Sequence, residues 1–565
     1  MPSVELVCSV AALSVATHLI FKTHEPTSPL PVLLALLLVP PLPAYALHAP
    51  LLPSYTLYPF FLALSIALYR LSPWHPLAAI PGPPLARLTK FWAMYITHTG
   101  AQHRTYRALH ARYGPLVRVG PNELSAAAPD AVVSVLGATG LPKGRYYAAR
   151  QDPHAPANLI TLSGDRHARR RRRWNAGMGA SASAEYLPVL VRRAQALVRR
   201  IGDAIDEGKK VEGGEGWGAK VDVAAWIRYF SFDFTGDMAF GGGFEMLRDG
   251  GDKEGLTHLF DSGARTLSHV SHIPWIAQTL RRIPGATATV LKMRAFGLRC
   301  ATKRIERGAE VKDLWYHLSD EAGTFPPKPP LAEVIADGAL VILAGSDTTT
   351  TVLSVLMYLL LTHPAAHARL RAEVDGARET EEGVLDAEHL EQLPFLNACL
   401  NEAMRLHPAV PVGGPRRVPD DGPSRVIAGQ VVPPGTEIYV PPYCLHRDPQ
   451  NFAPHTDDFW PERWILADAE ASGASAPGTT ADAKLIAHDK AAFIPFSYGP
   501  QNCAGKPLAW LEMRLVAAML VRAFDMRMVR ESERWTEGLR DYFILERGPL
   551  VVRMERRAQA AGVGV

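Results

Sequence analysis

Apolar residues crowd the first 71 positions of the chain and fall into three runs, at 4–21, 30–47 and 55–71. Each run has about 17–18 residues, which is the short end of what crosses a bilayer as a helix. The second run contains three prolines between positions 40 and 43, so it is either a kinked span or a re-entrant or interfacial segment. We predict that residues 1–72 form an N-terminal membrane anchor with one to three transmembrane segments.

A cleaved secretory signal is the alternative explanation of the first run. Such a signal carries basic residues before its apolar core, whereas the first lysine here, Lys22, follows the run. Because lysine and arginine favour the cytosolic side of a membrane, Lys22, Arg70, Arg87 and Lys90 predict that everything beyond Arg70 is cytosolic. With three spans, the N-terminus would lie on the opposite side.

Prolines dominate residues 73–84, which contain Pro73, Pro76 and the run Pro81-Gly82-Pro83-Pro84. Proline fixes φ and restricts the residue before it, so we expect a stiff linker here. From residue 85 onward the periodicity is mostly helical, and the predicted helices are 104–113, 184–207, 331–362, 364–374 and 396–406. Strand-like segments are short: 116–119, 425–427, 437–440 and 543–553, where Val551 and Val552 are predicted to form the return strand of a hairpin.

Residues 85–565 are therefore predicted to form one domain, mainly α with small β-sheets. Two stretches, 212–218 and 467–483, have glycine-rich or small polar compositions that predict surface loops. The composition, 47% hydrophobic and 21% charged, is that of a globular protein. A net charge of +4 over 565 residues does not indicate a nucleic-acid partner.

The five cysteines, Cys8, Cys300, Cys399, Cys444 and Cys503, are odd in number and widely spaced. This pattern indicates neither a disulfide framework nor a zinc site, and it favours a reducing compartment. Cys503 stands apart because it lies in the glycine- and proline-rich stretch F-I-P-F-S-Y-G-P-Q-N-C-A-G-K-P, at 493–507, just before a predicted helix at 507–524.

This cysteine loop has the residues that a thiolate ligand to haem iron needs. Backbone N–H groups at a helix start stabilise an anionic sulfur, and glycines let the backbone approach a flat ligand. Phe496 is suited to pack against a large apolar ring. Together these features suit a thiolate axial ligand.

The loop resembles the haem-binding signature of the cytochrome P450 family, F-x-x-G-x-x-x-C-x-G, at Phe496, Gly499, Cys503 and Gly505. The resemblance extends from about residue 85 to the C-terminus. It implies a cytochrome P450 fold preceded by N-terminal transmembrane helices, haem b as cofactor and Cys503 as the iron ligand. One position departs: Gln501 stands where the family often has an arginine or histidine that reaches a haem propionate, so its propionate contact is in doubt.

Two further segments match family motifs that hold the scaffold. Glu402 and Arg405 form an E-x-x-R pair on one helix face, which alone would be a routine surface pair. Pro461-Glu462-Arg463 resembles the family's P-E-R element. The resemblance implies that Glu402, Arg405 and Arg463 form a buried structural cluster that supports the cysteine loop.

A third motif, Ala344-Gly345-Ser346-Asp347-Thr348-Thr349, interrupts a long apolar helix with poor helix formers. The resemblance assigns Asp347 and Thr348 to proton delivery during oxygen activation, and Gly345 to space for dioxygen. The alternative is a helix kink in which the hydroxyls satisfy their own backbone.

The remaining expectations concern the haem propionates. His167 and Arg171, spaced i, i+4 within an arginine-rich segment, match the family's W-x-x-x-R pattern, with His167 at the aromatic position. Arg416, chosen over Arg417 by motif register, is a third propionate contact. The other arginines of 169–173 are expected to be solvated and to dock an acidic electron donor.

The resemblance implies a fungal-like, microsomal-type monooxygenase of secondary metabolism. It would use O2, a lipophilic small molecule and electrons from NADPH-cytochrome P450 reductase, with cytochrome b5 as an optional second donor, at the endoplasmic reticulum membrane. Two rivals stay open: an isomerase or peroxide-using haem-thiolate enzyme, and a non-enzymatic haem sensor. Substrate contacts are expected from 229–272, 410–413 and 542–545.

Overall fold

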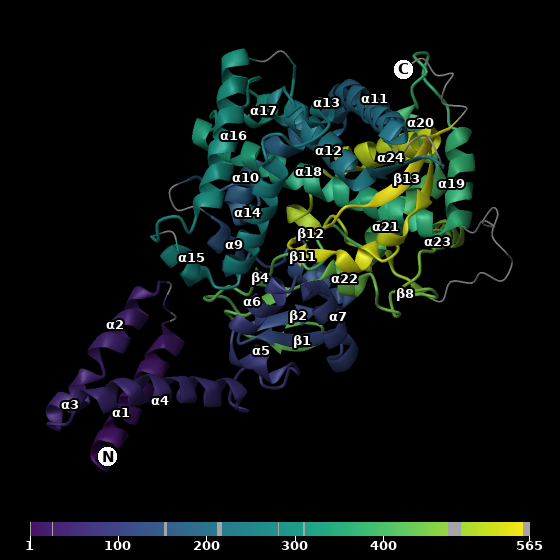
Figure 1. Ribbon diagram of the computed structural model, residues 1–565. Coiled ribbons are helices and arrows are strands. Elements are labelled where there is room, and N and C mark those ends of the chain that lie inside the picture. The colour runs from purple at the N-terminus through teal and green to yellow at the C-terminus, as the bar shows by residue number, and fades with distance from the viewer. Residues whose placement is uncertain are drawn as a thin grey trace.

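The computed structural model describes residues 2–24, 26, 28–151, 155–211, 217–280, 282–308, 311–472 and 487–557. A helical body carries several small sheets, and a group of N-terminal helices projects from one side of it (Figure 1). The predicted class, mainly α with small β-sheets, is confirmed.

Four helices make up the N-terminal group: α1 (Val4–Thr23), α2 (Leu30–Leu38), α3 (Pro41–Ala46) and α4 (Leu51–Leu71). α1 and α4 are long and apolar enough to cross a membrane, whereas the second apolar run is divided into α2 and α3 at Pro40. Polar groups join α1 to α4, because Ser14 donates to the Tyr58 carbonyl at 3.1 Å and the Tyr58 hydroxyl donates to Thr17 at 2.8 Å.

The segment between anchor and body packs against the body. Leu77 and Ile80 are buried in the same apolar cluster as Leu116 of the first strand. The backbone N–H of Arg118 donates to the Pro81 carbonyl at 2.7 Å. The end of α4 is thereby tied to the first sheet.

The body contains helices of very different lengths. They are α5 (Pro84–Leu88), α6 (Phe91–His98), α7 (Gln102–Tyr113), α8 (Pro129–Ala131), α9 (Arg145–Arg150), α10 (Gly164–Met178), α11 (Ala180–Val211), α12 (Val223–Phe240), α13 (Met246–Asp249), α14 (Leu256–Ser271), α15 (Pro274–Leu280), α16 (Ala288–Arg307), α17 (Leu314–Leu318), α18 (Leu331–Thr362), α19 (Pro364–Asp375), α20 (Ala387–Gln392), α21 (Pro394–Leu406), α22 (Pro442–Leu445), α23 (Glu462–Ser472) and α24 (Lys506–Ala523).

The central element is α18, which packs against α12, α16, α21 and α24 (Figure 1). Its residues are mainly apolar, with polar exceptions that include Asp337 and Asp347, and most of them are buried. A long, mainly apolar helix belongs either in a core or in a bilayer, and here surrounding helices cover it. Its bounds agree with the sequence prediction.

Small sheets flank the helices. One has the order β1 (Leu116–Gly120), β2 (Glu123–Ala126), β7 (Glu437–Tyr439), β4 (Arg416–Arg417), and another the order β10 (Phe524–Met528), β13 (Val551–Arg556), β3 (Ala219–Asp222). Two-stranded pairs are β11 (Arg540–Tyr542) with β12 (Ile544–Glu546), β5 (Arg425–Ile427) with β6 (Gln430–Val432), and β8 (Phe452–Ala453) with β9 (Ala487–His488).

Two sequence predictions were wrong in detail. The strand at Val551 is not the return strand of a local hairpin, because it pairs with β10 and β3, while the hairpin is β11–β12 with Phe543 at its turn. Residues 467–472, predicted as loop, form the last part of α23. The rest of that loop, from 473, and most of the loop at 212–218 lie outside the described residues.

Candidate active site around Cys503

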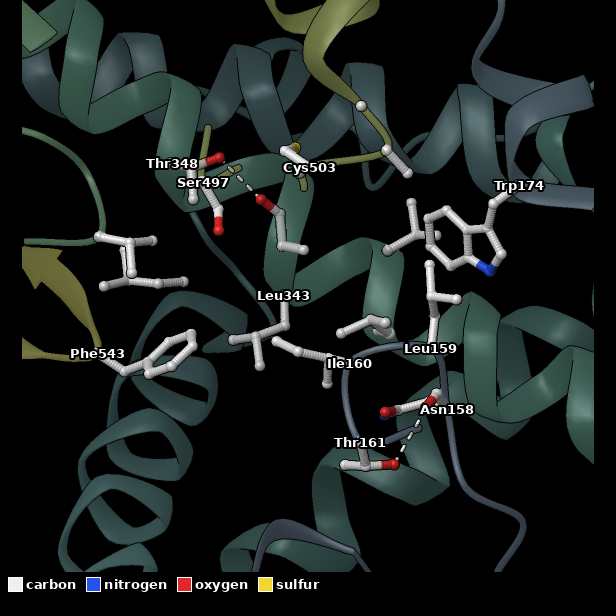
Figure 2. Close-up of a pocket in the computed structure, with 18 of the residues that line it drawn as sticks. Asn158, Leu159, Ile160, Thr161, Trp174, Leu343, Thr348, Ser497, Cys503 and Phe543 are labelled. Atoms are coloured by element: carbon white, nitrogen blue, oxygen red, sulfur yellow. Dashed lines mark hydrogen bonds between the residues drawn. The ribbon is translucent and has the colours of Figure 1, made fainter. Parts of the chain in front are cut away.

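A cavity of about 650 Å³ lies between α18, the cysteine loop, the segment before α10 and the β11–β12 turn. Cys503 and Thr348 lie at one end of it, and Asn158 and Thr161 lie at the other (Figure 2). Leu343 and Ile160 occupy the wall between the two ends (Figure 2). Parts of all three segments expected to contact substrate line the cavity: Phe234, Thr235, Met238, Phe260, Leu267, Val410, Val412, Gly413, Phe543 and Ile544.

The cysteine loop folds tightly around its backbone. Gly499 has φ +72°, and a Cβ at this position would lie 2.1 Å from the Leu136 carbonyl oxygen, so only glycine fits. The Cys503 N–H donates to the Phe496 carbonyl at 2.9 Å. Phe496 lines the cavity, and a Cβ on Gly505 would lie 4.0 Å from the Cys503 sulfur.

The Cys503 sulfur lies deep in the molecule, and its surface is open to the cavity. Burial raises the pKa of the thiol. The backbone N–H groups of Gly505 and Lys506, at the start of α24, act in the opposite direction, as do the charges of Arg171 and Lys506. These groups favour the thiolate, which is the form that binds a metal.

α10 holds the cysteine loop through Arg171. Its Nη1 donates to the Asn502 carbonyl at 2.5 Å, and its Nη2 donates to the Asn502 side-chain oxygen at 2.8 Å. His167 lies one turn earlier, is buried and also lines the cavity. Arg170, expected to be solvated, is instead buried and ion-paired with Asp337 at 3.0 Å. Arg166, Arg169 and Arg172 are exposed, as predicted for most of this basic segment.

Four basic side chains line the cavity near the cysteine loop: Lys143, His167, Arg171 and Arg416. Burial, followed by the charges of Arg416 and Arg171, lowers the pKa of Lys143 to about 7. Burial, followed by the charges of Lys143, Arg171 and Arg416, lowers the pKa of His167 to about 4. His167 is therefore neutral at pH 7, and the hydrogen bonds of Lys143, Arg171 and Arg416 within the described residues go to carbonyl or amide oxygens rather than to a carboxylate.

Two further details concern the partners of these basic side chains. The Nε of Arg416 is buried without a hydrogen-bond partner, while Nη1 donates to the Gln501 side chain. Among the cavity-lining residues that the structure describes, Glu512 is the only carboxylate. An open sulfur beside uncompensated cations fits haem, whose iron takes a thiolate and whose propionates are anionic.

Sequence reasoning missed Lys143. Its position depends on an isolated antiparallel bridge between Lys143 and Arg416, which are far apart in the chain. No local sequence pattern predicts a bridge between residues so far apart in the chain. Gln501, whose propionate contact was in doubt, accepts a hydrogen bond from Arg416.

Asp347 and Thr348 are neighbours that face different ways. Thr348 lines the cavity, and its hydroxyl donates to the Ala344 carbonyl at 2.8 Å. Asp347 does not line the cavity, because its carboxylate is held by Arg228 at 3.0 Å and Arg547 at 3.2 Å. Arg228 in turn contacts Asp261 of α14.

The alternative expectation for this motif also has support in the geometry. The hydroxyls of Ser346, Thr350 and Thr351, like that of Thr348, bond the carbonyl four residues earlier. A Cβ on Gly345 would lie 3.1 Å from Thr235 Oγ1 of α12. This glycine therefore permits the close approach of α12 to α18, which is a packing role that the sequence did not indicate.

Glu512 is a second residue that sequence reasoning missed. It lies on α24, is 5% exposed and lines the cavity. Ser231 donates to its Oε1 at 3.2 Å, and burial raises the pKa of the carboxyl to about 8. The signal was present, because Glu512 continues the buried face of the helix that Leu508, Leu515 and Val516 define.

Glu402, Arg405 and Arg463 are brought together, and each is 0% exposed. Arg405 forms two hydrogen bonds with Glu402, at 2.8 and 2.9 Å, and Arg463 forms one at 3.1 Å. Burial acts to raise the pKa of Glu402, but the charges and hydrogen bonds of the two arginines outweigh it and the pKa is lowered.

This cluster connects to the cysteine loop through one histidine. Arg405 donates to the His446 carbonyl at 2.9 Å. The Nε2 of His446 accepts a hydrogen bond from the Ile494 N–H at 2.9 Å. Ile494 lies two residues before Phe496, so the buried ion cluster supports the loop through a single intermediate residue.

Comparison with known proteins agrees with this geometry. The family model for cytochrome P450 matches residues 81–553. A protein named cytochrome P450 67 from Uromyces fabae is 30% identical over 571 residues, covering 97% of this chain and 99% of that protein. Cytochrome P450 monooxygenase cpaH from Aspergillus oryzae is 31% identical over 496 residues, covering 86% and 90%. Tryprostatin B 6-hydroxylase from Aspergillus fumigatus is 29% identical over 499 residues, covering 87% and 83%.

Haem is the cofactor of the matched family, and its fit to the cavity follows from the open sulfur and the uncompensated cations on the walls. The similar proteins are fungal monooxygenases, and the match extends over nearly all of the body. The chain therefore belongs to the cytochrome P450 family and is a monooxygenase of that family.

Proposed function

We propose that this protein uses haem b to insert one atom of O2 into a lipophilic small molecule, by hydroxylation or epoxidation. NADPH-cytochrome P450 reductase supplies the electrons, with cytochrome b5 as an optional second donor. The anchor holds the protein in the endoplasmic reticulum membrane with the body in the cytosol. The single observation that carries the proposal is the Cys503 sulfur, which is open to a mainly apolar cavity at the same end as Thr348 (Figure 2).

The role that we propose for each residue follows from its position on the cavity wall. Cys503 holds the iron, while Lys143, His167, Arg171 and Arg416 hold the propionates. When bound, the haem supplies the redox chemistry that cleaves O2 with two electrons and two protons. The apolar walls orient the substrate and exclude water, which is what the protein adds to the chemistry of its cofactor.

Proton delivery is assigned to Asp347 and Thr348. The Thr348 hydroxyl faces the cavity and holds a proton that it now donates to Ala344. Asp347 reaches the cavity only when its carboxylate leaves Arg228 or Arg547. We therefore propose that these two arginines position Asp347 and that breaking one ion pair releases it toward Thr348.

Two features support the proposed membrane location and the proposed electron donor. α1 and α4 are candidate spans, and the Lys22 Nζ lies 4.0 Å from the centre of the Tyr69 ring, next to Arg70. The basic ends of both helices therefore lie together, as expected for one cytosolic side. On the body, Arg166, Arg169 and Arg172 form an exposed basic edge of α10 that suits an acidic reductase.

Reconstitution separates this function from its rivals. The full-length protein is placed in lipid vesicles with NADPH-cytochrome P450 reductase, and consumption of O2 and NADPH is measured with a panel of lipophilic compounds. Product that requires both NADPH and reductase supports the proposal. Product formed equally well with peroxide alone, or rearrangement without O2, would favour a peroxide-using enzyme or an isomerase. Haem binding without any turnover would favour a sensor.

A further inference from the structure

Arg150, the last residue of α9, also lines the cavity. Its guanidinium carbon lies 4.1 Å from the centre of the Phe543 ring and 4.7 Å from that of Tyr146. Phe543 lies on the part of the cavity wall away from Cys503 (Figure 2). Arg150 is therefore held between aromatic faces at a distance from the sulfur.

Within the described part of the chain, Arg150 donates hydrogen bonds only to neutral hydroxyls. Nε donates to Ser271 at 2.9 Å, and Nη2 donates to Tyr146 at 2.7 Å and to Ser268 at 3.5 Å. Nη1 forms no hydrogen bond with any residue that the structure describes. Several more deeply buried arginines contact a carboxylate, as Arg170 does with Asp337, Arg304 with Asp313 and Arg405 with Glu402. The buried Arg118 instead donates to the backbone carbonyls of Pro121 and Arg70, and Arg150 itself is half-buried.

Arg171 and Arg416 also lack a carboxylate partner within the described chain, and their anion is supplied by the cofactor in the function proposed above. Arg150 shows the same deficit on another wall of the cavity. The charged group that faces it is Asp541, which is fully buried and is not in contact with it. Burial raises the pKa of Asp541 to about 7, so this carboxyl is a weak source of compensating charge.

We infer that Arg150 is the polar anchor of the substrate and that the substrate is an apolar molecule with a carboxylate. The carboxylate accepts hydrogen bonds from Nη1 of the guanidinium, the nitrogen that the hydroxyls leave unbonded, and the two opposite charges strengthen these bonds. The apolar part then extends along Leu343 and Ile160 toward Cys503. This inference rests on the proposed function, because it names the substrate class of the same cavity.

Matched ligands test the anchor by equilibrium binding. Haem-loaded full-length protein is titrated at pH 7.4 with dodecanoic acid and its methyl ester, and with abietic acid and its methyl ester. Binding is followed by the change in the Soret band. In at least one pair, the wild-type protein is expected to bind the acid at least 10-fold more tightly than the ester, because only the acid forms hydrogen bonds with Arg150 in which both partners are charged.

Three variants distinguish anchoring from a purely structural role. Arg150→Gln is expected to remove the preference for the acid while the ester binds as before. Arg150→Lys keeps the charge and should keep part of the preference. Ser271→Ala removes a hydrogen bond that orders Arg150 but leaves its charge, so the preference should persist.

Several outcomes would overturn the inference: equal binding of acid and ester, survival of the preference in Arg150→Gln, or binding of neither member of both pairs. The spectrum of the reduced protein with carbon monoxide is recorded in parallel. An intact thiolate spectrum with no preference for the acid refutes the anchor alone. Loss of that spectrum in the wild-type protein would instead refute the proposed function.

Discussion

Arg171 and Asn502 are joined by two hydrogen bonds, one to the backbone carbonyl and one to the side chain of the asparagine. Asn502 directly precedes Cys503, so α10 holds the cysteine loop in place through contacts between protein groups alone. The arginine expected to bind a propionate therefore also positions the backbone that carries the iron ligand.

We expect Arg171→Gln to weaken haem retention, because it removes both a cation near the propionates and the charged hydrogen bonds to Asn502. The loss should be about 1–3 kcal/mol in haem affinity. Transfer of haem to apomyoglobin measures it, and Arg169→Gln on the exposed face of the same helix serves as the control. Equal haem loss in both variants would contradict this role.

Arg463→Ala should destabilise the fold by about 3–5 kcal/mol, because it leaves the Glu402–Arg405 pair buried without its third member. Urea unfolding followed by circular dichroism in detergent measures the change. The control is Arg369→Ala, which breaks a partly exposed ion pair with Glu462 and should cost less than about 1 kcal/mol. Similar losses of stability in the two variants would show that the buried cluster stabilises the fold no more than a partly exposed ion pair does.

Thr348→Ala should separate NADPH consumption from product formation, since it removes the hydroxyl that faces the cavity. Product per NADPH is expected to fall at least about 10-fold while NADPH oxidation continues. The matched control is Thr350→Ala, which removes a similar hydroxyl–carbonyl hydrogen bond on α18 at a position that does not line the cavity. Unchanged coupling in Thr348→Ala would exclude it from proton delivery.

The raised pKa of Glu512 predicts how the stability of the fold depends on pH. Its pKa is about 8 in the folded protein and 4.5 when unperturbed, so between these values only the folded state keeps the proton. The stability of the wild-type protein relative to Glu512→Gln should therefore fall as pH rises from about 5 to 8, by at most about 1.4 kcal/mol per pH unit. Urea unfolding of both proteins across this range measures the difference. A difference that is constant with pH would mean that Glu512 is ionised in the folded state.

Local sequence patterns predicted the parts of this site that lie within one helix of regular periodicity. The mainly apolar sequence of α18 predicted its bounds, and the spacing of Glu402 and Arg405 placed them on one face of α21. The parts that failed depend on contacts between distant segments. β13 pairs with β10 and β3 rather than with its neighbour in sequence, and Lys143 reaches the cavity through a bridge to Arg416.

The ion pairs around Asp347 are a second example of contacts between distant segments that the sequence did not predict. They bring together α12, α18 and the segment after β12, through Arg228 and Arg547. A carboxylate on an apolar helix is visible in the sequence, but the arginines that neutralise it come from segments more than 100 positions away. Periodicity carries no information about such partners, so these ion pairs became apparent only in the fold.

The central claim is that Cys503 binds haem iron as a thiolate. The most direct test is the spectrum of the full-length protein in detergent, reduced and exposed to carbon monoxide, for the wild type and for Cys503→Ala. The wild type is predicted to show a strongly red-shifted Soret band that is absent from the haem-loaded variant. A folded, haem-loaded wild type without the shift, or a variant that keeps it, would contradict the assignment of Cys503 as the ligand.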